Sequence, residues 1–263
     1  MKMFLKEAYV YKELLIFPEK MKGQVIYPDI ARELVAEAAD AFPINSMIFS
    51  RMPDGKNVQG VYGDAGDGEG WGLPPRIFFG GGQGFIRVTG LGQEGSDLLG
   101  SEASMIATAV AAKLGPYSFK INDGTCTVQR SRPFLYRIGR LILSKKLTVM
   151  NAHKDTDGRC TLESVSPLIR RAIIGGIVSQ ARFLDQNSGG MSGSLESVIG
   201  TDDMLGLRII DGSAGIIKVK KNERLHALVV SNLVFSLDLD LRGPWLAGIL
   251  RSRGFGLIRK ERV

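Results

Sequence analysis

The chain has 263 residues, a formal net charge of +7 at pH 7 and 23% charged residues. Its 44% apolar content is typical of a folded protein and excludes an intrinsically disordered chain. No apolar run is long enough to span a membrane, and charges interrupt the N-terminal apolar segment, which therefore lacks a signal-peptide core. We expect one large or two compact domains in a cytoplasmic protein without a membrane segment.

The charge is unevenly distributed along the chain. Residues 1–100 carry 10 Lys and Arg against 13 Asp and Glu, whereas residues 101–263 carry 24 against 14. A basic half attached to a weakly acidic half suggests a polyanionic partner, although a solvated basic face without a partner fits equally well.

Metal and cofactor signatures are missing from the sequence. Cys126 and Cys160 match no zinc spacing and are expected to be free thiols, and the two histidines, His153 and His226, have no ligand-like neighbours. The run Gly80–Gly84 lacks the Lys-Ser/Thr of a phosphate-binding loop, and no nucleophile elbow is present. We therefore expect no metal and no cofactor.

The first half predicts the order strand, helix, strand, strand, helix, strand, which is that of a ferredoxin-like domain. The expected elements are Ala8–Phe17, Pro28–Ala41, Arg76–Phe79, Phe85–Val88, Glu102–Leu114 and Tyr117–Ile121, with a further short strand near Val58–Tyr62.

The second half repeats a similar order with longer insertions. Its expected elements are a strand at Phe134–Leu143, a helix from Ser166-Pro167 to Leu184, strands at Leu207–Ile210, Gly215–Val219 and Leu225–Leu241, a short helix from Gly243-Pro244 to Ile249, and a last strand after Gly256. The prediction is thus an α+β fold of two ferredoxin-like domains in tandem, residues 1–132 and 133–263.

The C-terminal segment from Gly248 to Gly256 interleaves glycines with arginines. Its backbone can approach phosphate closely, Arg251 and Arg253 can donate paired hydrogen bonds to phosphate oxygens, and Phe255 can stack on a base. A tight turn with merely solvated arginines is the competing interpretation.

The stretch from Pro244 to Ile258, with Gly248-Ile249 and Gly254-Phe255-Gly256-Leu257, resembles the glycine-rich loop of the repeat-associated (RAMP) CRISPR proteins. It is most similar to the loop of their CRISPR-RNA processing endoribonucleases, and the sequence as a whole looks closest to the type IV branch. Leu250 departs from that loop, because the family usually has glycine there.

The resemblance implies a protein that binds the repeat stem-loop of precursor CRISPR RNA and cleaves it without metal at the 3′ side of the stem. The ribose 2′-OH attacks the adjacent phosphate, which leaves a 2′,3′-cyclic phosphate, and the mature CRISPR RNA stays bound and passes to other effector-complex subunits. The alternative is a non-catalytic CRISPR-RNA-binding subunit of an effector complex. An unrelated basic α/β binding protein with an accidental loop similarity is a third reading.

The family often places a catalytic histidine near the first helix, and this chain has none there. The basic and phenolic residues in the matching region are Lys20, Lys22, Tyr27 and Arg32. Our catalytic candidates are Arg242, which precedes the turn toward the glycine-rich loop, then Arg32 and Lys22. Ordinary solvent exposure or a helical ion pair is the competing explanation for each. His153 could serve as a general base if its loop folds over the site, and ordinary solvent exposure of that polar loop is the competing explanation.

The remaining candidates are RNA contacts, most of them basic, which together would give salt-sensitive binding. They are Arg251, Arg253, Phe255, Gly254 and Gly256 of the glycine-rich loop, Lys218, Lys220, Lys221 and Arg224 of a basic hairpin, Arg170 and Arg171 at a helix start, and Arg137, Arg140, Lys145 and Lys146 after the linker.

Overall fold

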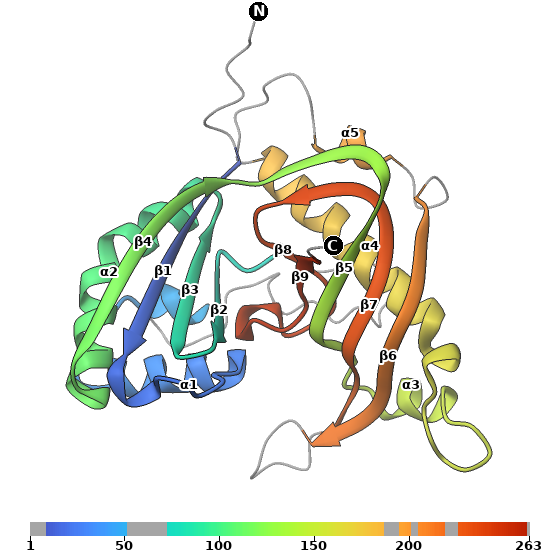
Figure 1. The fold of residues 1–263 in the computed structure, drawn as a ribbon, viewed down its shortest axis with the longest axis horizontal. Helices are drawn as coiled ribbons and strands as arrows, with labels where there is room; N and C mark the ends of the chain where they lie inside the picture. Colours follow the sequence, from blue (N-terminus) through green and yellow to red (C-terminus); the bar gives the residue numbers. More distant parts are fainter. Residues whose placement is uncertain (1–8, 52–72, 187–194, 201–204, 219–225, 262–263) are drawn as a thin grey trace, which may run out of the picture.

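The computed structural model describes residues 9–51, 73–186, 195–200, 205–218 and 226–261. The molecule has two lobes, each built on one antiparallel sheet with helices on its outer face (Figure 1). The chain passes from one lobe to the other at Cys126, between strands β4 and β5. No helix within the described ranges is long and apolar enough to cross a membrane.

The first lobe has the predicted ferredoxin-like order. Its elements are β1 (Val10–Pro18), α1 (Pro28–Ala39), β2 (Ile77–Gly82), β3 (Phe85–Leu91), α2 (Gly92–Leu114) and β4 (Tyr117–Thr125), with short 3-10 turns η1 (Glu19–Met21) and η2 (Ser46–Phe49). The sheet order is β2-β3-β1-β4, and both long helices cover one face of it. The strand expected near Val58–Tyr62 lies outside the described residues.

The second lobe repeats that plan with insertions. Its elements are β5 (Thr127–Ser144), α3 (Leu147–Ala152), α4 (Leu162–Gln186), α5 (Leu195–Ile199), β6 (Leu207–Lys218), β7 (His226–Arg242), β8 (Trp245–Leu246), the 3-10 turn η4 (Arg251–Arg253) and β9 (Leu257–Lys260). The sheet order is β6-β7-β5-β9-β8, so β9, β5, β7 and β6 form the ferredoxin-like set and β8 is added at the edge. The fold prediction of two ferredoxin-like domains is confirmed.

The expected helix from Gly243 to Ile249 is wrong, because this segment contains the short strand β8 (Trp245–Leu246) instead of a helix. Trp245 pairs with Ile258 and Leu246 with Leu257. On the side of β8 that faces away from β9, the buried Gln180 side chain of α4 pairs with the backbone. Its amide nitrogen donates to Pro244 O at 2.7 Å, and its oxygen accepts from Leu246 N at 3.2 Å. A buried extended segment needs such partners for its backbone groups.

Helix α4 starts earlier than Ser166-Pro167. Thr161 and Ser164 cap it reciprocally: Thr161 Oγ1 accepts from Ser164 N at 3.1 Å, and Ser164 Oγ accepts from Thr161 N at 3.2 Å. Pro167 lies inside the helix. Strand β5 also starts before the expected linker, and Thr127 to Arg130 already pair with β7. The change of sheet at Cys126 therefore precedes the domain boundary expected at Arg132.

Candidate nucleic-acid interface between the lobes

The glycine-rich loop adopts left-handed backbone conformations at four positions. Gly248, Gly254 and Gly256 have φ values of +71°, +81° and +78°, and Leu250 has +58°. Leu250 thus keeps the conformation for which glycine is better suited, although it carries a side chain.

The glycine-rich loop packs directly against the first lobe. A β-carbon at Gly254 would lie 1.6 Å from the carbonyl oxygen of Phe79 in β2 and 2.7 Å from Pro28 Cβ. Both the close approach of the Phe79 carbonyl and the positive φ therefore require glycine at position 254. Turn η4 consequently contacts both β2 and α1.

Two side chains of this loop are buried, which corrects the expectation that they reach RNA freely. Arg251 is only 5% exposed and donates to Leu73 O at 3.2 Å, and burial lowers the pKa of its guanidinium to about 10. Phe255 is 4% exposed and packs with Ile142, Val229 and Ile249 beneath the loop. Both residues hold the loop in place, while Arg253 is half-buried.

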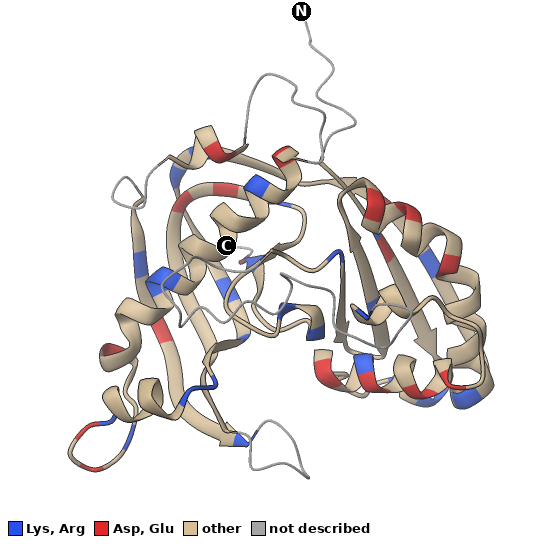
Figure 2. Ribbon diagram, turned by 180° about the vertical axis from the view of Figure 1, so that it is seen from behind, with Lys and Arg blue, Asp and Glu red and all other residues tan. Residues whose placement is uncertain are grey.

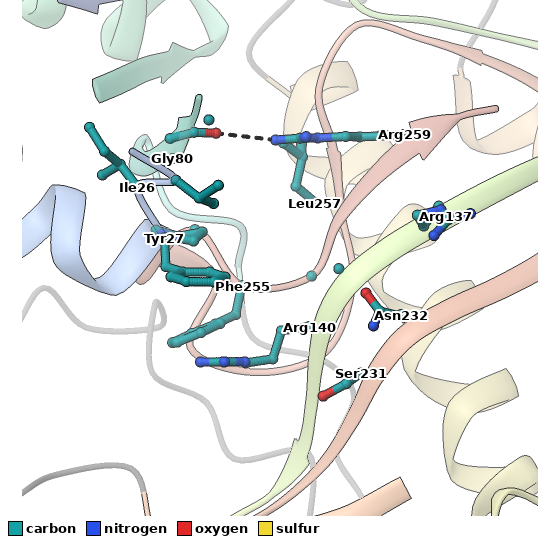
Figure 3. Close-up of a pocket in the computed structure, with 17 residues that line it drawn as sticks. Ile26, Tyr27, Gly80, Arg137, Arg140, Ser231, Asn232, Phe255, Leu257 and Arg259 are labelled. Carbon is teal, nitrogen blue, oxygen red and sulfur yellow. Dashed lines mark hydrogen bonds between the residues drawn. The ribbon is translucent and has the colours of Figure 1, made fainter. Parts of the chain in front are cut away.

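A cavity of about 400 Å³ lies where the loop, the first lobe and the second sheet meet (Figure 3). Residues 25–28 and 80–82 form its wall on the first lobe, residues 254–257 of the loop and Arg259 of β9 form the middle, and β5 and β7 form the opposite wall. The β5 and β7 residues are Arg137, Gly139, Arg140, Ser231 and Asn232.

The three arginines of the cavity have different surroundings. The Arg140 guanidinium carbon lies 5.6 Å from the Tyr27 ring centre and 5.9 Å from that of Phe255, within cation–π range. Arg137 forms an ion pair with Glu261. Arg259 donates to Gly81 O at 3.5 Å, and burial together with the nearby Arg87 lowers its pKa (Figure 3).

Arg140 is the arginine best placed to receive a ligand. Within the described ranges, its guanidinium makes no hydrogen bond or ion pair, so its N–H groups remain available beside the exposed Tyr27 ring. Its own carbonyl oxygen accepts from Gly256 N at 2.9 Å, which ties β5 to the loop.

An irregularity shared by β5 and β7 brings the polar residues of the cavity together. In β5, Tyr136 and Ile138 face the core under α4, and further along the strand Leu141 and Leu143 do so too. The inward-facing residues are therefore even-numbered before Gly139 and odd-numbered after Arg140. In β7, Val230 and Leu233 show the same shift. As a result, two consecutive residues of each strand face away from that core and line the cavity: Gly139 and Arg140 of β5, and Ser231 and Asn232 of β7. In a regular strand, consecutive residues face opposite sides of the sheet.

The lining of the cavity carries cations, aromatic rings and glycines, and it contains no Asp, Glu, His or Cys. Among the described residues, no three such side chains gather in a way that could hold a metal ion. The arrangement suits a polyanion whose backbone passes close to glycine main chain while arginines contact its phosphates.

The structure does not bring the three predicted catalytic residues together. Arg242 ends β7, roughly 30 Å along the strand from Asn232, is 70% exposed and pairs with Asp240 at 3.2 Å. The Arg32 guanidinium lies 6.0 Å from the ring centres of Phe49 and Phe79 and donates to Phe49 O at 3.3 Å, inside the first lobe. Lys22 is exposed on the segment that leads into the cavity wall.

The other predicted RNA contacts are dispersed (Figure 2). Arg170 lies within α4, where it donates to Leu205 O and Leu207 O at 3.0 and 3.2 Å and so braces β6. Arg171 and Lys218 are exposed, and Lys145 and Lys146 are half-buried before α3. Lys220, Lys221 and Arg224 lie outside the described residues. His153 Nδ1 lies 2.7 Å from Ser164 O and packs against the start of α4, which indicates a structural role.

From the sequence, Tyr27 is noted beside the first helix without a role, and Arg259, Ser231 and Asn232 are not noted as site residues. Tyr27 occupies the position before the first residue of α1, and Pro28 fixes the start of that helix. The signal for the other wall was present: the apolar residues at 136, 138, 141 and 143, and at 228, 230, 233 and 235, change phase at matching places. Such a paired phase shift predicts a local break in the pleat of both strands, and the pairs Ile138–Leu233 and Arg140–Ser231 show that the β5–β7 register is kept across it.

Comparison with known proteins agrees with this architecture. A family model described as the type IV CRISPR-associated endonuclease Csf5 matches residues 13–262. A structure described as the type IV Cas6 crRNA endonuclease Csf5 matches with a TM-score of 0.61 and 16% identity, over 96% of this chain and all of the other. Two structures of Cas6b match over the same shares, with TM-scores of 0.61 and 0.53 and identities of 16% and 15%.

No curated protein matches the chain. The solved structures, at these low identities, support the fold, whereas the family model covers nearly the whole chain. The chain belongs to the type IV CRISPR-associated endonuclease family Csf5, whose members are Cas6-like proteins that process CRISPR RNA.

Proposed function

We propose that this protein is a metal-independent endoribonuclease that binds the repeat stem-loop of precursor CRISPR RNA and cuts it at the 3′ side of the stem. The observation that carries the proposal is the Arg140 guanidinium, which lies in the cavity between the lobes with its N–H groups available. The cavity adjoins the glycine-rich loop, so RNA bound along that loop would pass Arg140.

The reaction we propose is transesterification. The 2′ oxygen forms a bond to the adjacent phosphorus, the bond from phosphorus to the 5′ oxygen of the next nucleotide breaks, and the 2′ proton leaves to solvent while the 5′ oxygen gains one. The products are a 2′,3′-cyclic phosphate and a 5′-OH. Arg140 would donate to the non-bridging oxygens, where negative charge grows in the transition state.

Positioning is the second contribution of the cavity. The exposed Tyr27 ring beside Arg140 can support the nucleotide at the cleavage point, because base–aromatic stacking tolerates any base. A fixed nucleotide brings the 2′ oxygen into line with the scissile bond. No histidine lines the cavity, so we propose a slow enzyme that relies on charge and orientation.

Arg242, Arg32 and Lys22, the catalytic candidates from the sequence, have supporting roles in this proposal. Arg242 is exposed far along β7 and suits a contact with the stem, and Lys22 approaches the cavity from the first lobe. Arg32 of α1 packs against Phe79 of β2 and would act indirectly, by holding these two elements in place beside the cavity. We further propose that the mature RNA stays bound, that other effector-complex subunits receive it, and that these steps take place in the cytoplasm.

The test is single-turnover cleavage of a cognate repeat RNA in excess EDTA. We expect Arg140→Ala to slow cleavage about 100- to 1000-fold, as is typical when one donor to a developing oxyanion is removed. Arg182→Ala is the control, because Arg182 is exposed on α4 and pairs with Glu196 away from the cavity. Arg242→Ala is measured alongside, with a larger effect on affinity than on the cleavage rate.

The results separate the two candidate functions. Cleavage in EDTA that depends on Arg140 supports the metal-independent nuclease. Tight binding of the hairpin by every variant, with no cleavage by the wild type, would instead support the non-catalytic CRISPR-RNA-binding subunit.

A further inference from the structure

We propose that Asn232 and Ser231 read the edge of one unpaired base that enters the cavity beside the scissile phosphate. We further propose that they select a base whose ring N–H lies next to a carbonyl, which is guanine or uracil. This inference rests on the proposed nuclease function and names the part of the RNA that the cavity recognises.

The cavity can hold a base together with its sugar. Its volume of about 400 Å³ lies within the range of small-molecule sites. Its β5 wall is open where a base would lie, because a β-carbon at Gly139 would have no atom within 4 Å. Figure 3 shows Tyr27 at one side of the cavity and Asn232 and Ser231 at the other. A base that stacks on Tyr27 would therefore present its edge to β7.

The backbone at Asn232 is unusual in a way that serves the cavity. Asn232 has φ +52°, one of three non-glycine residues in the described ranges with a positive φ. The register between β6 and β7 shifts opposite this point, between Asp211 and Ser213. Bulges next to functional sites redirect side chains, and here two consecutive polar residues of β7 reach one cavity.

The amide of Asn232 is not needed to hold that backbone. Within the described ranges, neither the Asn232 side chain nor the Ser231 hydroxyl forms a hydrogen bond, and Asn232 is exposed. Glycine would adopt φ +52° with less strain. The backbone conformation at position 232 favours glycine, yet the residue there is Asn. Its amide therefore offers the cavity one donor and one acceptor group.

The surrounding charges decide which base fits. Arg137, Arg140 and Arg259 only donate hydrogen bonds, so they favour a base with carbonyl oxygens. The Asn232 oxygen can accept from a ring N–H while its NH₂ group donates to the adjacent carbonyl. Guanine and uracil offer that pair, whereas adenine has no carbonyl and cytosine has no ring N–H in its neutral form.

The experiment uses purified full-length protein and repeat hairpin RNAs in which each nucleotide flanking the scissile phosphate is replaced in turn by the other three. Single-turnover cleavage rates and affinities are measured in EDTA for the wild type, Asn232→Gly and Gly139→Val. At one flanking position, we expect RNAs that carry guanine or uracil to be cut about 10- to 100-fold faster than RNAs that carry adenine or cytosine. Such a ratio is typical of the discrimination by a paired polar contact.

The two variants separate base reading from a structural role. Asn232→Gly relieves the backbone and removes the amide, so the ratio between the bases should approach one while the protein remains folded by circular dichroism. Gly139→Val narrows the cavity without a backbone clash and should slow cleavage of all the RNAs alike. Ser231→Ala should reduce the ratio in the same direction as Asn232→Gly.

A wild type that cuts all RNAs at similar rates, or an Asn232→Gly variant that keeps the full preference, would overturn base reading and leave the nuclease intact. Normal cleavage by Gly139→Val would equally exclude a base in the cavity. If no RNA is cut, the proposed nuclease function fails, and the affinity ratios of the same RNAs decide the inference.

Discussion

Tyr136 shows how one hydroxyl stabilises the centre of the second sheet. Its oxygen accepts from Leu241 N at 2.9 Å and donates to Leu239 O at 2.7 Å, and the side chain is 1% exposed. These contacts lie beside the register shift between Arg130 and Phe134 of β5, so the hydroxyl bonds backbone groups of β7 next to this break in the ladder. We expect Tyr136→Phe to lower the free energy of unfolding by about 1–3 kcal/mol.

Urea denaturation measures that effect. The matched control is Tyr117→Phe, because the half-buried Tyr117 hydroxyl makes no hydrogen bond within the described ranges. An equal, small change in both variants would show that the Tyr136 hydroxyl does not satisfy the β7 backbone.

Asp240 gives the second lobe a specific response to acid. The hydrogen bond from Lys260 Nζ, at 2.8 Å, lowers the pKa of this carboxyl, and Arg242 lowers it further. A depressed pKa in the folded state stabilises the protein above the ordinary pKa of Asp and loses that contribution as pH falls through the folded-state value. The stability difference between wild type and Asp240→Asn should therefore be present at pH 7 and shrink below about pH 4.

Urea titrations at several pH values check this expectation. A difference between wild type and Asp240→Asn that stays constant from pH 7 to pH 3 would show that the charge of Asp240 does not contribute.

At the scale of elements, the glycine-rich loop joins the lobes through backbone contacts that a side chain would block. Gly254→Ala should place a methyl group against Phe79 O and strain the backbone, so we expect a loss of about 1–3 kcal/mol in stability together with slower RNA cleavage. Gly215→Ala is the control, because a β-carbon there meets no atom within 4 Å. Thermal unfolding of both variants gives the comparison, and equal midpoints would contradict the docking role of the loop.

The element order was predictable because apolar periodicity and capping residues are local signals. The start of α2 was not, since Gly92, Gly95 and Gly100 look like a turn, yet a β-carbon at Gly95 would lie 2.5 Å from Arg76 O. Strand β8 was mistaken for a helix because Gln180, which completes its hydrogen bonds, is distant in the sequence. The Arg140 site needs three separate segments, so no local pattern distinguishes Arg140 from Arg137.

At the scale of the whole molecule, the described basic residues of the second half do not all serve as free contacts for a polyanion. Several cations of the second lobe are engaged in structural contacts. Arg130 pairs with Asp238, and Arg170 donates to the carbonyl oxygens of Leu205 and Leu207 at the start of β6. The cationic site is instead created where the two lobes meet, with Tyr27 from the first and Arg140 from the second. Under the proposed function, cleavage therefore requires both lobes in their docked arrangement.

We propose that the 2′ oxygen of the RNA is the nucleophile at this site, without a metal ion. The most direct measurement compares, in excess EDTA, a repeat hairpin with a single 2′-deoxy nucleotide immediately 5′ of the scissile phosphate and the all-ribose hairpin. We predict that both bind with similar affinity, that only the all-ribose RNA is cut, and that its product ends in a 2′,3′-cyclic phosphate. Cleavage of the 2′-deoxy RNA at an equal rate would contradict the account.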